Sequence, residues 1–134
     1  MPVPEHRYSK KNVEVPGVLA KTLRPHQREG VQFMYECVMS LKGYDGAGCI
    51  LADDMGLGKT LQSVALIYTL LKTGVTACGR PTAKRVIVIC PCSLVKNWDN
   101  EFVKWLGKGG EIAVSHFVVA KHFIISFIAA LTCS

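Results

Sequence analysis

The pattern of apolar and polar residues predicts three amphipathic helices. One begins at Pro25, one runs from Leu61 and ends before Gly74, and one runs from Ser93 to Leu106. In each of them apolar residues recur every three or four positions, which places them on one helix face. Proline suits a first helical turn because its missing N–H would have no intrahelical partner there, and serine is a good N-cap.

Two short apolar runs, residues 49–52 and 86–90, predict buried strands. The helix that starts at Leu61 lies between them, so the three elements form a strand–helix–strand unit, for which parallel pairing and a right-handed crossover are the rule. The predicted fold class is therefore α/β, with a partial parallel sheet flanked by helices. Because so few strands are predicted, we expect some apolar surface to stay exposed.

The last part of the chain is more apolar than the rest. Residues 112–131 contain fifteen apolar residues out of twenty, and a membrane span is one interpretation because the length is right. However, Lys121 would lie near the bilayer centre at a cost of about 2.5–3.5 kcal/mol, and two histidines and two serines weaken the run. We therefore expect no membrane insertion, and favour a buried strand, over about 112–120, with a helix, or a weakly specified tail.

Composition limits the class of protein. The chain has 134 residues and a mass of 14.7 kDa, which suits one small domain or part of a larger one but not a two-lobed motor. Its net charge of +6 and isoelectric point near 9.1 favour an anionic partner. The six cysteines lie mostly in apolar runs, as expected of buried thiols in a reducing compartment. Cys90 and Cys92 are assigned a structural role, because no second pair of cysteines or histidines follows at a zinc-like spacing.

The stretch between the first predicted strand and the second predicted helix has the chemistry of a phosphate-binding loop. The residues predicted to contact nucleotide there are Asp53, Asp54, Met55, Gly56, Leu57, Gly58, Lys59 and Thr60. Glycines allow a tight turn in which successive N–H groups point inward, and the helix N-terminus adds a partial positive charge. Lys59 can reach the β- and γ-phosphates of ATP, and the Thr60 hydroxyl can ligate Mg²⁺. A plain glycine-rich turn before a core helix would not need a lysine and a threonine at the helix start.

The general phosphate-loop pattern would place a glycine at position 53, where this sequence has Asp53. With that departure, the run from Ala52 to Thr60 resembles the phosphate loop of the helicase-like ATPases of superfamily two, specifically of the Swi/Snf group of DNA translocases. Asp54 stands where that group more often has a glutamate, and both residues are carboxylates.

Further stretches carry the same resemblance. Residues 23–31 are similar to the group's glutamine-bearing segment, residues 60–62 continue the phosphate loop as the group does, and residues 88–98 resemble its next block, which lies near DNA. Residues 35–39 and 98–107 are most similar to the recombination and repair branch of the group.

The resemblance covers about residues 15–113 and implies a P-loop, RecA-like first ATPase lobe that uses ATP and Mg²⁺ to track along double-stranded DNA. Members of the repair branch assist the strand-exchange recombinase on chromatin and duplex DNA, so it also implies those partners, a part in chromatin remodelling and a nuclear location. In the group, the glutamine that matches Gln27 reads adenine. Its side-chain amide offers a donor and an acceptor that suit the adenine N6 amino group and N7, although Gln27 taken alone reads as a solvated helix residue.

Hydrolysis needs more than a phosphate cradle: a second carboxylate must hold Mg²⁺ or orient the attacking water, and an arginine must meet the charge that develops on the γ-phosphate. In the group these come from an Asp-Glu box and from a second lobe, and the sequence after Thr60 contains neither. We therefore expect an incomplete first lobe, with residues 23–113 as the N-terminal part of the ATP-binding lobe. Residues 1–22 are expected to be an extended segment, and residues 114–134 an apolar tail without family resemblance.

The isolated chain is thus expected to bind nucleotide weakly, without turnover. The alternative is a non-catalytic or unstable truncated fragment that only engages the family's partners. A small-molecule kinase with a phosphate loop is a third interpretation, disfavoured by Asp53 and by the lack of an arginine-rich lid segment after the loop. A truncated gene model, an alternative transcript or a retained intron would each explain the change of composition after Val114.

Basic residues outside the loop are candidates for DNA contact, because lysine and arginine can bind phosphates without reading sequence. They are Arg80, Lys84, Arg85 and Lys96. A solvated surface explains them equally well. Trp98 and Trp105 lie seven residues apart on an apolar helix face, so we expect them in the core rather than stacked on bases.

Overall fold

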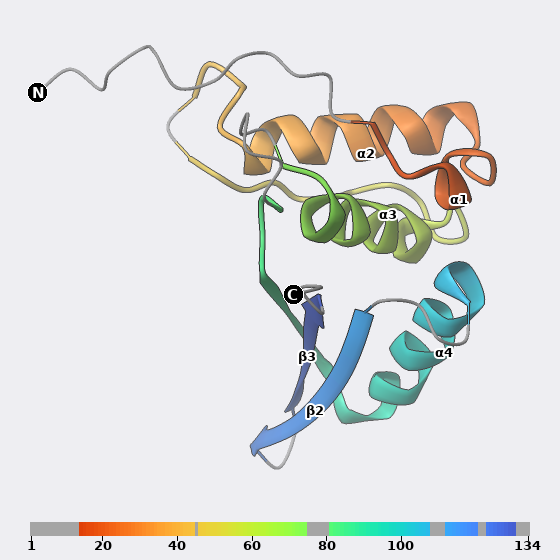
Figure 1. The fold of residues 1–134 in the computed structure, drawn as a ribbon, viewed down its shortest axis with the longest axis vertical. Coiled ribbons are helices and arrows are strands. Elements are labelled where there is room, and N and C mark those ends of the chain that lie inside the picture. Colours follow the sequence, from red (N-terminus) through yellow and green to blue (C-terminus); the bar gives the residue numbers. More distant parts are fainter. Residues whose placement is uncertain (1–13, 45, 75–80, 108–111, 121–122, 131–134) are drawn as a thin grey trace, which may run out of the picture.

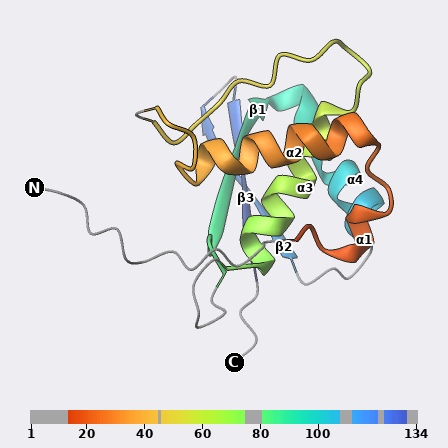
Figure 2. The ribbon, with the colours of Figure 1, turned by 90° about the horizontal axis from the view of Figure 1, so that it is seen from above.

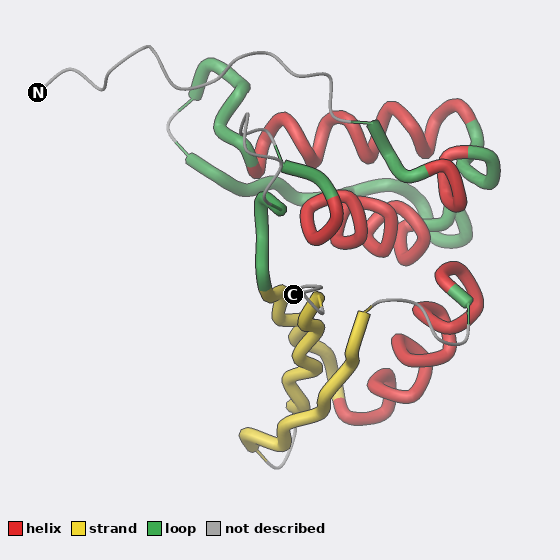
Figure 3. Tube along the Cα trace, in the orientation of Figure 1, coloured by secondary structure: helices red, strands yellow, loops and turns green. Residues whose placement is uncertain are grey.

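The computed structural model describes residues 14–44, 46–74, 81–107, 112–120 and 123–130 (Figure 1). The elements in chain order are α1 (Gly17–Ala20), α2 (Pro25–Val38), α3 (Lys59–Lys72), β1 (Arg85–Pro91), a 3-10 turn η1 (Cys92–Leu94), α4 (Val95–Leu106), β2 (Ile112–Ala120) and β3 (Phe123–Ala130). Figure 3 separates them by type, with α2 and α3 on one side of the molecule and the strands beside α4 on the other. The single turn of α1 lies in a segment for which an extended course was predicted.

Helix α2 begins where the sequence predicted. Pro25 is its first residue, and Arg24 before it is extended, with φ −70° and ψ 160°. The backbone N–H of Arg24 donates to Oε1 of Gln27 at 2.9 Å, which satisfies a donor at the helix start. Val31 and Met34, from the predicted apolar face, are buried.

The other two predicted helices are confirmed as α3 and α4. α3 ends at Lys72, two residues before Gly74. α4 ends at Leu106, and Gly107 after it has φ 82° and donates its N–H to the carbonyl of Val103 at 2.9 Å. Glycine adopts this positive φ, here combined with a ψ of 160°, at little cost, so it stops the helix as predicted.

The predicted N-cap of α4 is wrong. Ser93 lies inside η1, and Leu94, which has no capping side chain, precedes the helix. The cause is Pro91, which ends β1 and leads directly into the 3-10 turn. That turn keeps Ser93 away from the first α-helical amides.

The described strands form one three-stranded sheet with the order β1-β3-β2. Both pairs are antiparallel, with Val88 of β1 opposite Ser126 and Phe117 of β2 opposite Ile125. The predicted strands over 86–90 and 112–120 are thus confirmed as β1 and β2. The helix expected in the tail is wrong, because residues 123–130 return alongside β2 as β3, where their backbone groups pair on both sides. No helix in the described ranges is long and apolar enough to cross a membrane.

The predicted strand over residues 49–52, and with it the parallel pairing to β1, is not found among the described residues. The segment is assigned to no strand, and Ile50 in it is 88% exposed. β1 pairs with β3 instead. The physical reason is that a short apolar run favours an extended backbone without specifying its partner, which tertiary contacts decide. The described chain therefore mixes helices and strands as predicted, but its sheet is antiparallel.

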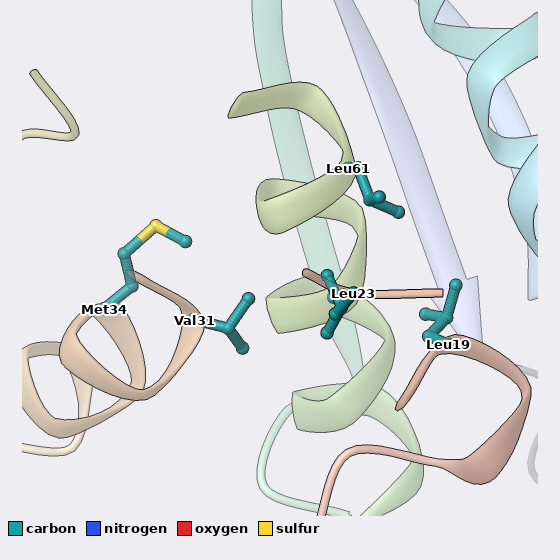
Figure 4. Packing of buried hydrophobic residues seen from close by; sticks show 6 residues of the cluster. Leu19, Leu23, Val31, Met34 and Leu61 are labelled. Carbon is teal, nitrogen blue, oxygen red and sulfur yellow. The ribbon is translucent and has the colours of Figure 1, made fainter. Parts of the chain in front are cut away.

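Helix α3 lies at the centre of the core, because two clusters of buried residues share it. On one face, Leu61 and Ala65 pack with residues of α1 and α2, and Figure 4 shows Val31 pointing from α2 towards α3. On the other face, Val64 and Leu71 pack with residues of β1 and α4. Figure 2 shows α2 crossing over α3. Trp98 and Trp105 are half-buried against these clusters, as the sequence predicted.

Candidate phosphate-binding loop

The loop before α3 is shaped by two glycines. Gly56 has φ 87° and Gly58 has φ 81°, both in the left-handed region that glycine adopts most readily. Between them the N–H of Leu57 points back to the carbonyl of Asp54, at 3.5 Å. These conformations turn the chain from the loop before residue 56 into the first turn of α3.

Lys59, the first residue of α3, bends back into this loop. Its Nζ donates to the main-chain carbonyl of Asp53 at 2.6 Å and to that of Asp54 at 2.7 Å. Both acceptors are neutral, so no carboxylate cancels the charge of the ammonium through these bonds. The ammonium is therefore held over the start of the loop with its positive charge available to an anion.

The first turn of α3 adds further donors. The N–H groups of Lys59, Thr60 and Leu61 have no intrahelical acceptor, and the N-cap Gly58 has no side chain that could bond to them. The first turn contains no acidic residue, so the positive end of the helix dipole is not neutralised there. The Thr60 hydroxyl follows directly on the lysine, half-buried.

This donor set fits a polyphosphate. An uncapped helix N-terminus and a lysine ammonium both attract phosphate oxygens, and a neighbouring hydroxyl is a ligand that Mg²⁺ accepts in such loops. The remaining loop residues Asp54, Met55 and Leu57 are exposed, with Met55 95% accessible. The side of the loop opposite α3 is thus open.

Gln27 ties α2 to the loop. Its Oε1 accepts from Arg24, and its Nε2 donates to the carbonyl of Leu57 at 3.1 Å. His26 lies beside it, with Nε2 at 3.4 Å from the same carbonyl. The Gln27 side chain is 6% exposed, so the residue predicted to read adenine is buried next to the phosphate loop and uses both ends of its amide within the chain.

Gln62, which the sequence marked only through the family resemblance of residues 60–62 and not as a site residue, contacts the loop from α3. Its Nε2 donates to Oδ2 of Asp53 at 3.2 Å, and the side chain is fully buried. The available signal was its spacing: Gln62 follows Lys59 by three positions, so the two side chains leave the same face of α3.

The structure does not gather the basic residues predicted to contact DNA. Lys84 and Arg85 are exposed at the start of β1, whereas Lys96 is exposed in the first turn of α4, beyond the other end of that strand. A seven-residue strand spans about 20 Å, which separates the two positions. Arg80 lies outside the described residues.

A metal site independent of nucleotide finds no support in the described part of the chain. No group of three or more histidine, cysteine, aspartate or glutamate side chains there could hold a metal ion. Cys90 is buried and Cys92 is exposed, and both are free thiols. The expected burial of the thiols is confirmed for Cys37 and Cys90 and is wrong for Cys49 and Cys92, which are exposed.

Comparison with known proteins gives one family and a set of similar sequences. A family model described as the SNF2-related domain matches residues 26–121. The DNA repair and recombination protein RAD54 of Oryza sativa subsp. japonica is 59% identical over 95 residues, which are 70% of this chain and 10% of that protein.

Two further relatives agree. The DNA repair protein rhp54 of Schizosaccharomyces pombe is 55% identical over 101 residues, covering 75% of this chain and 11% of that protein. The DNA repair and recombination protein RAD54B of Gallus gallus is 55% identical over 96 residues, covering 72% and 10%. The chain thus spans about a tenth of the length of these curated relatives.

Proposed function

Because the chain belongs to the SNF2-related domain family, we propose that it is the nucleotide-binding part of an ATP-dependent translocase on double-stranded DNA. The observation that carries the proposal is the pairing of an uncapped α3 N-terminus with the Lys59 ammonium held over the loop. The ammonium has three N–H donors, and two of them are held by the carbonyls, so the third can donate to a phosphate oxygen.

The roles of the residues follow from their chemistry. Lys59 binds the outer phosphates, and the N–H groups of the first helical turn bind the phosphates nearer the helix axis. Bound Mg²⁺, ligated by Thr60, would neutralise part of the triphosphate charge. Gln27 is proposed to contact adenine, which requires its Nε2 to leave the carbonyl of Leu57 when nucleotide arrives.

The cellular setting is proposed from the names of the relatives. They are named for DNA repair and recombination, and one Arabidopsis thaliana relative is named for chromatin remodelling. We extend this to a nuclear protein that acts in recombinational repair with duplex DNA, chromatin and a strand-exchange recombinase. Of the basic residues, Lys84 and Arg85 are adjacent, so they are the better candidates for a common phosphate contact.

The chain by itself is proposed to bind Mg-ATP weakly and not to hydrolyse it at a useful rate. The loop supplies electrostatic binding, whereas the sequence after Thr60 has no Asp-Glu box to hold Mg²⁺ or to orient the attacking water.

The test uses Lys59→Ala in the 134-residue chain. Mg-ATP should raise the thermal midpoint of the wild-type chain in a concentration-dependent way, and this shift should disappear in the variant. Lys72→Ala is the matched control, because it removes a lysine at the opposite end of the same helix, about 20 Å away. Its ATP shift should equal that of the wild type.

Two results would contradict this function. An ATP shift that persists in Lys59→Ala would mean that the nucleotide binds elsewhere. DNA-stimulated ATP hydrolysis that Lys59→Ala abolishes would support the site but overturn the absence of turnover.

The alternative of an unstable or non-catalytic interaction fragment is favoured by the exposed apolar side chains. Ile50, Ile87 and Ile89 are 88%, 55% and 69% accessible. A thermal scan without a cooperative transition, with or without Mg-ATP, would support an unstable fragment. A cooperative transition that ATP leaves unchanged would support a folded partner-binding fragment.

A further inference from the structure

Gln62 combines two features that rarely occur together without a reason. Its side chain is fully buried, yet its Oε1 has no hydrogen-bond partner among the described residues. A buried oxygen without a partner costs stability, and an apolar side chain of similar shape would avoid that cost. The reason for a glutamine at this position must therefore lie in its Nε2, which donates to the carboxylate of Asp53.

Asp53 is held from two directions by neighbouring turns of α3. Lys59 donates to its main-chain carbonyl at 2.6 Å, and Gln62 donates to its carboxylate at 3.2 Å. The second bond fixes the side chain of the residue whose carbonyl receives the ammonium. Any displacement of Asp53 would thus move an acceptor of Lys59.

The opposite side of Gln62 is bounded by α2. A Cβ added at Gly30 would collide with Oε1 of Gln62, so the absence of a side chain at Gly30 makes room for the carboxamide. Glycine inside a helix is otherwise unfavourable relative to alanine. The close approach of Gly30 leaves the Gln62 amide little freedom except to face Asp53.

We propose that Gln62, backed by Gly30, is a positioning residue that holds Asp53 so that the start of the loop keeps the Lys59 ammonium in place for phosphate. Asp53 occupies the position where the general phosphate-loop pattern has glycine. Its carboxylate accepts the hydrogen bond from Gln62, which a glycine could not do. The inference deepens the proposed function and rests on it for the identity of the ligand.

The test is a double-mutant cycle of Asp53→Ala and Gln62→Leu in the full chain. Each single variant should weaken the apparent Mg-ATP affinity by about two- to thirty-fold, and the double variant should be no weaker than the worse single one. Asp53→Asn should retain near wild-type affinity because it keeps an oxygen acceptor for Nε2. Since Gln62→Leu removes the unpartnered oxygen, its thermal midpoint without nucleotide should equal or exceed that of the wild type.

Gly30→Ala provides a second experiment that changes neither Asp53 nor Gln62. It should weaken ATP binding as Gln62→Leu does, because the new methyl group displaces the carboxamide. Displacing a buried side chain should also lower the thermal midpoint of this variant, so its affinity is measured well below that midpoint. In a Gln62→Ala background, Gly30→Ala should cause no further loss of affinity. A purely structural role for Gln62 would instead lower the thermal midpoint of Gln62→Leu together with its affinity, and that result would overturn the inference.

A nucleotide-free measurement separates this inference from the proposed function. Amide hydrogen exchange of the peptide that covers residues 53–58 should be faster in Asp53→Ala and in Gln62→Leu, with no further increase in the double variant. If the wild-type chain fails to bind ATP, the proposed function is lost, but this coupling still decides the role of Gln62. Additive effects in exchange would refute the role even in a chain that binds ATP.

Discussion

At the scale of single residues, Gly58 is constrained more tightly than Gly56. Both have positive φ values, 81° and 87°. A Cβ at Gly58 would in addition collide with Nε2 of Gln27, whereas a Cβ at Gly56 would meet no atom within 4 Å. A substitution at Gly56 therefore tests backbone strain alone, whereas a substitution at Gly58 tests backbone strain together with a side-chain clash.

We predict that Gly58→Ala destabilises the chain more than Gly56→Ala does. Each variant should lose about 1–2 kcal/mol from the left-handed conformation. Gly58→Ala should lose more, because it also breaks the bond from Gln27 to Leu57. Urea unfolding midpoints measure both variants. Equal losses would mean that Gln27 is not held against the loop in solution.

A second residue-scale prediction concerns Glu36 near the end of α2. Its carboxylate lies 2.7 Å from Nζ of Lys42 and accepts from Nε2 of Gln32 at 3.0 Å. The hydrogen bond from Lys42, and then that from Gln32, lowers the pKa of Glu36 below its usual value of 4.5. A carboxyl whose pKa is lowered in the folded state adds stability above the unfolded pKa, and this is lost as pH falls through the folded value.

The prediction is tested with Glu36→Gln. At pH 7 the wild type should melt at a higher temperature than the variant, and the difference should shrink as pH falls below 4.5 and vanish once the carboxyl is protonated in the folded chain. Glu29→Gln, which changes an exposed carboxylate on the same helix, is the control and should show a smaller difference. A gap that does not shrink as pH falls below 4.5 would assign the effect to packing rather than to ionisation.

At the scale of elements, the sequence predicted the helices well, because periodicity and end signals are local. Pro25 and Gly107 mark ends that the structure keeps. Ser93 failed as an N-cap because Pro91 introduces a 3-10 turn that a capping rule does not consider. The strand expected over residues 49–52 failed because a strand needs a partner, and β1 is paired with β3.

The candidate site divides in the same way. The glycines, lysine and threonine of the loop are contiguous, so their pattern could be read directly from the sequence. The bonds from Gln27 to Leu57 and from Gln62 to Asp53 join residues 30 and 9 positions apart. Such contacts depend on how α2 and α3 pack, which no local pattern encodes. The role of Gln27 in binding adenine stays a prediction.

At the scale of the whole molecule, the two faces of β1 differ. Val88 and Cys90 are buried, with Val88 packed against the helices, whereas Ile87 and Ile89 on the other face are 55% and 69% exposed. Exposed apolar side chains on a sheet favour self-association. Uncovered apolar surface was expected because so few strands were predicted, and these two residues carry part of it.

We predict that Ile89→Thr reduces concentration-dependent light scattering with little change in stability, within about 0.5 kcal/mol, because threonine keeps a β-branched side chain on an exposed face. Val88→Thr is the matched control. It places a hydroxyl in the buried face and should cost about 1–3 kcal/mol. Equal destabilisation by both changes would show that Ile89 is covered in solution.

The order of the strands has a consequence for assembly. β1 is an outer strand of the described sheet, with β3 along one side only. Its far side presents backbone amides and carbonyls, bounded by Arg85 at the start and by Pro91, which lacks an N–H, at the end. A strand from another molecule can therefore pair with this edge of β1 and lengthen the sheet, without breaking the pairing of β2 with β3.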